Sequence, residues 1–146
     1  MKELINLLAQ QEENLISLHE IITDYQKALI AGDLHGMEHL LDSEQKRLSS
    51  IQNNLEIQQN LIKGISDRNN LNLSPFSIKK LVDALPSGAK ETIKLNKLMK
   101  SLKIYAGLIS EKNRLNGLLI IHSRNFIKEI ITSLIHNNKN ILDRKI

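Results

Sequence analysis

The chain has 146 residues, of which 41% are hydrophobic and none is cysteine, and its net charge is +4. This length suits a single domain over residues 1–146, and the lack of cysteine excludes disulfides and thiolate metal sites. No apolar run reaches about 18 residues, and charged and amide side chains interrupt the pattern soon after Met1. We therefore expect no membrane insertion and no secretory signal, and we expect a cytoplasmic protein.

The basic residues are scattered along the chain. The densest stripe is formed by Lys97, Lys100 and Lys103, at a spacing of three. A nucleic-acid site would need a denser patch with stacking aromatic residues, and the chain has only two Phe and two Tyr. We interpret the stripe as a solvated helix face and expect no nucleic-acid partner.

Residues 1–31 follow a heptad pattern, which predicts a long helix with a coiled-coil-like seam. Gln11 is the polar member of a series that steps by three and four: Met1, Leu4, Leu8, Gln11, Leu15, Leu18, Ile22, Tyr25 and Leu29. Gly32 can end this helix in a left-handed cap, and Asp33 can cap the start of the next one.

Residues 33–64 repeat the alternation and predict a second long helix. The series is Leu34, Met37, Leu41, Glu44, Leu48, Ile51, Leu55, Gln58 and Ile62. Because the connection is so short, the two helices should lie antiparallel as a hairpin. Gly64 and the polar run over residues 66–70 predict a loop after it.

A short helix over residues 74–85 and a long last helix over residues 89–138 follow, with a tail over residues 139–146. Ser74 and Pro75 suit a helix start, and Pro86 suits a stop. The last helix would be about 75 Å long, more than its partners, so it breaks or extends past the body. The predicted fold is all-α: an elongated helical bundle with a long antiparallel coiled-coil-like hairpin, a short third helix and a long fourth helix.

Two amides interrupt the apolar face of the last helix. Asn116 falls near the centre of that face and Asn113 falls inside it, on the side formed by Leu95, Leu98, Leu102, Tyr105, Leu108, Ile109, Leu119, Phe126, Ile127, Ile130 and Leu134. A buried amide is costly unless it is hydrogen-bonded. The pair can fix helix alignment, cap backbone groups near Gly64 or the short helix, or bind a partner.

Beyond Asn116 the apolar side chains cover an arc of roughly 200°, although one buried face needs only about 100°. A fully sandwiched helix, a homodimer or a groove for a partner helix would each explain the excess. The candidate partner-binding residues are Asn113, Asn116, Leu118, Leu119, Ile120, Phe126, Ile127, Ile130, Ile131, Leu134 and Ile135.

The sequence gives little sign of an enzyme. None of the five histidines stands three residues after a glutamate, as ferritin-like di-iron sites require, and none has the Lys and Gly that follow a phosphotransfer histidine. His35 and His39 have a chelating i,i+4 spacing, but a third ligand at a persuasive spacing is lacking. We expect no catalysis, no cofactor and no metal.

The pattern Asn113-x-x-Asn116-Gly117-x-Leu119, followed by a long amphipathic helix, resembles the FlgN-type flagellar export chaperones. The segment over residues 28–33 is similar to the family's first turn, and Glu44-Gln45-Lys46 followed by Leu48 is similar to its second helix. The order of helices also matches, so the resemblance covers about residues 1–137.

The resemblance implies a non-enzymatic chaperone that binds a C-terminal helical segment of flagellar hook-associated (hook–filament junction) proteins, mainly through its last helix. Such chaperones deliver their clients to the flagellar type III export apparatus. The tail over residues 139–146 departs from relatives that carry an aromatic docking residue there. The alternatives are a structural coiled-coil homodimer or adaptor with no export role, and a catalytic or phosphotransfer bundle.

Overall fold

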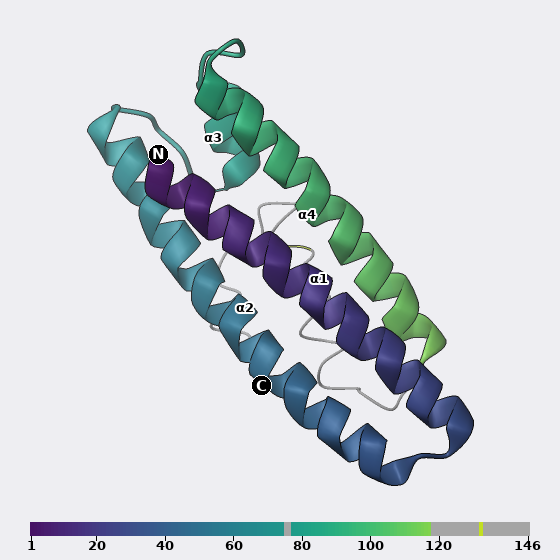
Figure 1. Cartoon of the computed structure of the whole chain (residues 1–146). Helices are drawn as coiled ribbons and strands as arrows, with labels where there is room; N and C mark the ends of the chain where they lie inside the picture. Colours follow the sequence, from purple (N-terminus) through teal and green to yellow (C-terminus); the bar gives the residue numbers. More distant parts are fainter. Residues whose placement is uncertain (75–76, 118–131, 133–146) are drawn as a thin grey trace.

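The computed structural model describes residues 1–74, 77–117 and 132, which contain four helices and no strand (Figure 1). They are α1 (Lys2–Ala31), α2 (Leu34–Arg68), α3 (Ile78–Ala84) and α4 (Lys90–Leu115). The all-α prediction is confirmed. In Figure 1, α1 lies between α2 and α4, and the short α3 lies beside the start of α4.

The turn between α1 and α2 has the predicted caps. Gly32 has φ 69°, its N–H donates to Leu29 O, and the Asp33 N–H donates to Ala28 O. The Asp33 carboxylate accepts a hydrogen bond of 2.9 Å from the Gly36 N–H. Such a tight reversal makes α1 and α2 antiparallel, as predicted, whereas α4 runs parallel to α1 (Figure 1).

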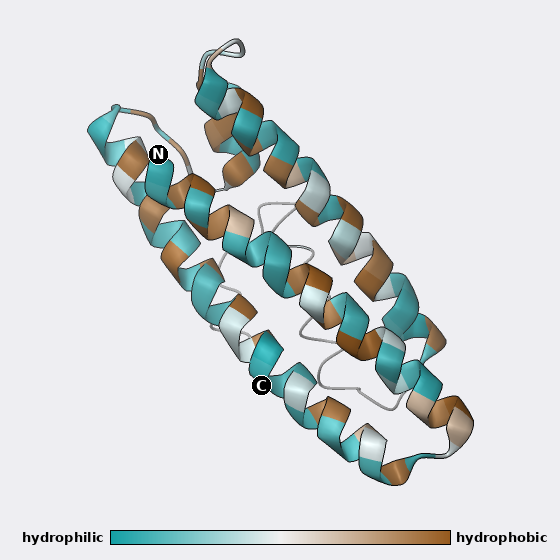
Figure 2. Cartoon of the chain, in the orientation of Figure 1, coloured by the Kyte–Doolittle hydropathy of each residue, from teal (hydrophilic) through white to brown (hydrophobic). Residues whose placement is uncertain are grey.

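Apolar side chains recur along every helix, and the heptad positions form the core (Figure 2). The buried cluster joins all four helices: Leu4, Leu8, Leu15, Leu18, Ile22, Leu48, Ile51, Leu55, Ile62, Ile65, Ile78, Leu81, Val82, Leu95, Leu102 and Ile109. α1 contacts both α2 and α4, while α2 and α4 make little direct contact in the described part of the chain. Within the described residues, α1 is therefore the helix that joins α2 to α4.

A buried polar chain explains the polar heptad position at Gln11. The Gln11 Nε2 donates to Ile51 O at 3.1 Å, and Gln11 Oε1 accepts from Asn14 Nδ2 at 3.2 Å. Arg47 Nη1 then donates to Asn14 Oδ1 at 2.9 Å. Because these bonds are satisfied in one alignment of α1 and α2, they fix the register of the hairpin.

Another polar pair lies in the core further along the hairpin. Tyr25 and Glu44 are both buried, from α1 and α2 respectively. Burial, with a smaller contribution from the Glu44 carboxylate, raises the pKa of Tyr25 above its ordinary value. Ionisation of this phenol therefore requires a higher pH in the folded protein than in a solvent-exposed tyrosine.

α2 continues past the predicted loop. It runs through Gly64 to Arg68. Ile65 is buried and continues the series of buried residues that includes Ile62, and the Ser66 hydroxyl donates a hydrogen bond to Leu71 O just after the helix. The backbone reverses only at Asn70, which has φ 54°. The end predicted at residue 64 was wrong by one helical turn.

α3 is shorter than predicted at both ends. Its N-cap is Ser77, whose Oγ accepts from the Lys80 N–H at 3.1 Å, so the predicted cap at Ser74 is wrong. Leu85 is extended, with ψ 155°, because a residue before proline is forced away from the helical region.

α4 ends at Leu115, although the long last helix was expected to continue to residue 138. Asn116 closes the helix with a bond from its N–H to Lys112 O, and Gly117 then takes φ 74°. A left-handed residue directly after a helix is a common way to stop it. The break is one of the two outcomes that the length of this segment predicted. In the described ranges no helix is long and apolar enough to cross a membrane.

Candidate partner-binding site

The described part of the predicted site is the end of α4. Asn113 and Asn116 are 2% and 3% exposed. Asn116 Nδ2 donates to Ile22 O of α1 at 3.2 Å. This bond joins α4 to α1, which is the kind of contact that the alignment role requires of Asn116.

A second contact ties the same end of α4 to α1. Lys112 Nζ donates to Gln26 Oε1 at 3.2 Å, one turn along α1 from Ile22. Each net hydrogen bond contributes about 1 kcal/mol. Together with the apolar contact of Ile109, these bonds set where α4 ends along α1.

The two amides also leave buried acceptors. Asn113 Oδ1 and Asn116 Oδ1 have no hydrogen-bond partner among the described residues. An unmade bond at a buried oxygen costs about 1–3 kcal/mol. These two oxygens at the base of the predicted site are thus able to accept a hydrogen bond. In the described part of the chain, no donor offsets the free energy of burying them.

Gly117 decides how the chain leaves α4. Its φ of 74° lies in the left-handed region that side chains with a Cβ rarely adopt. Among the described residues, a Cβ built at Gly117 meets nothing within 4 Å, so no close neighbour in that part of the chain requires a glycine. The glycine is required by backbone conformation instead.

The other predicted site residues lie outside the described residues. They are Leu118, Leu119, Ile120, Phe126, Ile127, Ile130, Ile131, Leu134 and Ile135. In the described part, the site consists of the pinned end of α4, two buried acceptors and a glycine that turns the chain.

The sequence reasoning missed an apolar stripe on the opposite face of α4. Ile93, Ile104, Leu108 and Leu115 are exposed and fall within an arc of about 60°. We name these four residues the outer stripe. Leu108 was assigned to the core face, and this was wrong, since 45% of it is exposed. These four residues recur with the helical period of 3.6 residues on the otherwise polar face of α4, and this pattern is the signal that could have revealed the outer stripe from the sequence.

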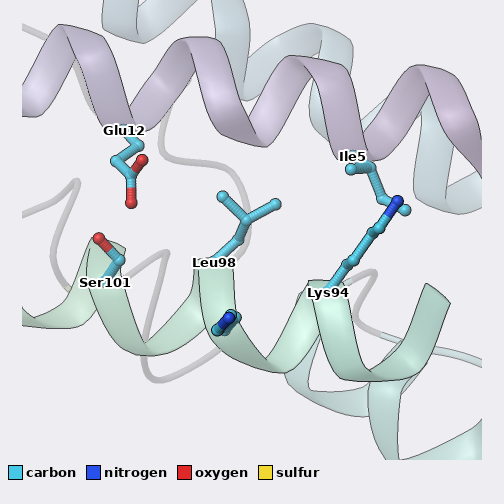
Figure 3. Close-up of a pocket in the computed structure, with 6 residues that line it drawn as sticks. Ile5, Glu12, Lys94, Leu98 and Ser101 are labelled. Carbon is cyan, nitrogen blue, oxygen red and sulfur yellow. The ribbon is translucent and has the colours of Figure 1, made fainter. Parts of the chain in front are cut away.

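A shallow cavity of about 450 Å³ lies at the seam between α1 and α4 (Figure 3). Its lining is mixed: Ile5, Glu12, Lys94, Lys97, Leu98 and Ser101. Figure 3 shows Glu12 and Ser101 facing each other across the seam, with Leu98 beside them. No group of three or more potential metal ligands occurs within residues 1–74 and 77–117, and His35 and His39 are exposed at the start of α2. The seam joins two helices and has no cluster suited to metal chemistry in that part.

The model of the family described as FlgN protein matches residues 1–142. No significant match was found among curated proteins or among solved structures. The family match spans α1 to α4 and the predicted partner-binding segment together.

Proposed function

Because the chain belongs to the FlgN family of flagellar export chaperones, we propose that it binds hook-associated (hook–filament junction) proteins in the cytoplasm. It holds a C-terminal helical segment of each client, keeps the client unassembled and delivers it to the flagellar type III export apparatus. The observation that carries this proposal is the family match over residues 1–142.

The end of α4 supports a division of labour within the chain. Asn116 is bonded to α1, and Asn113 is buried beside it, so both amides suit a positioning role at the base of the site. We assign client contact to the residues after Gly117, at Leu118, Leu119, Ile120, Phe126, Ile127, Ile130, Ile131, Leu134 and Ile135. Their apolar arc exceeds what one buried face requires.

The chemistry of this segment suits an amphipathic client helix. Apolar anchors at spacings of three and four accept a helix with the complementary pattern. A client segment that is disordered when free would fold on binding, which lowers affinity for a given area and favours release at an export gate.

Co-purification with clients tests the proposal. The chain is co-expressed with the last 40 or so residues of each junction subunit of the same organism, a length of about 60 Å if helical. We expect a stable complex with at least one segment. The Phe126→Glu/Ile130→Glu double variant should lose that complex, because two charges would be buried at the interface.

A matched control uses two exposed apolar residues of the α1–α2 hairpin. Ile30 and Leu34 flank the α1–α2 turn, and the Ile30→Glu/Leu34→Glu variant makes the same chemical change there. It should retain the complex. If no junction subunit co-purifies, the proposed clients are wrong, and if Phe126→Glu/Ile130→Glu still binds, the assigned residues are wrong.

Light scattering separates this proposal from the alternative of a structural coiled-coil homodimer or adaptor. A tight dimer that never exchanges for a client would favour the alternative. A chain that forms a complex with a client segment in place of self-association would favour the chaperone.

A further inference from the structure

The outer stripe places four exposed apolar residues on one face of α4, where Lys97, Lys100 and Glu111 are also exposed. Seven large apolar residues are exposed in the described part of the chain, and four of them are Ile93, Ile104, Leu108 and Leu115. They span about 33 Å along one face of one helix. Single exposed apolar residues are ordinary, whereas an aligned set on a surface is typical of an interaction site.

Gly107 makes this surface unusual. It is exposed between Ile104 and Leu108, its φ is not left-handed, and a Cβ built there meets none of the described residues within 4 Å. Neither the backbone nor internal packing therefore requires a glycine, although glycine weakens a helix. A missing side chain beside two apolar residues allows a partner backbone to come close.

The charge around the stripe selects the partner. α4 contains seven basic and two acidic residues, a net charge of +5, while the whole chain has +4. Within the described residues, no carboxylate forms an ion pair with Lys90, Lys94, Lys97, Lys100 or Lys103. Near the other end of α4, Arg114 pairs with Glu111 at 2.7 Å. The first half of the stripe thus lies among uncompensated positive charges.

We propose that the outer stripe is a docking surface for an amphipathic helix of a partner protein whose apolar face is flanked by acidic residues. The apolar anchors would pack against Ile104 and Leu108, the partner backbone would approach at Gly107, and its carboxylates would face the lysines. This surface lies on the face of α4 opposite the core and upstream of the client segment assigned above. The inference therefore stands whether or not that assignment holds.

Other occupants fit the surface less well. A lipid surface does not require the missing side chain at Gly107. Single-stranded nucleic acid would need stacking aromatic residues, which the outer stripe lacks. Pairing with a second copy of the chain would bring two faces of the same positive charge together.

Two designed peptides of about 21 residues, as long as the stripe, test the proposal. Both carry leucine at spacings of three and four, and one is flanked by glutamate while the other is flanked by lysine. Fluorescence anisotropy with the full chain measures both affinities. We expect the glutamate peptide to bind at least about tenfold more tightly, with a preference that fades as salt is raised.

Variants locate the binding. Leu108→Glu should abolish binding of the glutamate peptide, whereas Ile57→Glu on α2 should leave it unchanged. Ile57 is a matched control because it is 47% exposed and Leu108 is 45% exposed. Gly107→Leu should also weaken binding while helix content, followed by circular dichroism, is retained. Circular dichroism on every variant separates lost folding from lost docking.

Four results would overturn the proposal. They are equal affinity for both peptides, binding that survives Leu108→Glu, tighter binding of anionic vesicles or of single-stranded DNA, and a dimer in light scattering that Leu108→Glu disperses. The last would show that a second copy of the chain occupies the stripe.

Discussion

Replacing glycine by alanine at two positions of one segment should give opposite effects on stability. Gly107 lies in the interior of α4, where a Cβ would contact none of the described residues, and Gly117 lies just after the helix with φ 74°. In a helix interior, alanine is more stable than glycine by about 0.5–1 kcal/mol. In the left-handed region, alanine destabilises the folded state by roughly 1–2 kcal/mol. About half of this is offset, because alanine also lowers the conformational entropy of the unfolded chain.

These energies predict the shifts in melting temperature. A 146-residue chain has an unfolding entropy of about 0.3 kcal/mol/K. Gly107→Ala should therefore raise the melting temperature by about 2–3 °C, and Gly117→Ala should lower it by about 2–3 °C. Thermal unfolding followed by circular dichroism, which reports helix content, measures both.

Gly64→Ala on α2 is the matched control, because that glycine is helical and a Cβ there would lie 3.5 Å from Arg68 Nη1, an ordinary contact. It should behave like Gly107→Ala. If Gly117→Ala raises the melting temperature as Gly107→Ala does, the helix continues through residue 117 and the reasoning about its end is refuted.

Three further changes test the rest of the scaffold. Gln11→Ala, which leaves Asn14 Nδ2 without its acceptor, should cost about 1–3 kcal/mol in urea unfolding; an unchanged midpoint would contradict the register role. Asp33→Ala removes the cap on the Gly36 N–H and should cost about 0.5–2 kcal/mol by the same assay, whereas a neutral effect would show that the cap is unimportant. Because the pKa of Tyr25 is raised in the folded state, its contribution to stability is complete below about pH 10 and is lost as the pH rises further. In urea unfolding at a series of high pH values, the free energy of unfolding of Tyr25→Phe should therefore fall less with pH than that of the wild-type chain. An equal fall in both proteins would contradict the assignment.

The hairpin was the part of the fold that the sequence predicted best. The heptads, Gly32 and Asp33 act locally, so residue type and spacing were enough to place α1, its turn and the start of α2. The ends of α2 and α3 were predicted less well, because several residues could cap them. Ser77 competes with Ser74, and only tertiary packing decides that Ile65 continues the buried series.

The candidate site was predicted only in part. The apolar pattern correctly placed Asn113 and Asn116 among buried residues, but a sequence does not show which of several backbone carbonyls will accept from an amide. It also did not show the exposed position of Leu108, since a helical wheel gives angles and not the position of the neighbouring helices. Both outcomes depend on contacts between residues about 90 positions apart, such as Asn116 with Ile22.

The central claim is that this chain is an export chaperone for hook–filament junction proteins, and secretion measures it most directly. The gene is deleted in its own organism, and junction proteins and hook protein are quantified in the culture medium. The account predicts that junction proteins fall sharply while hook protein is unchanged, and that the wild-type chain restores them but Phe126→Glu/Ile130→Glu does not. Normal secretion of junction proteins without the chain would contradict the account.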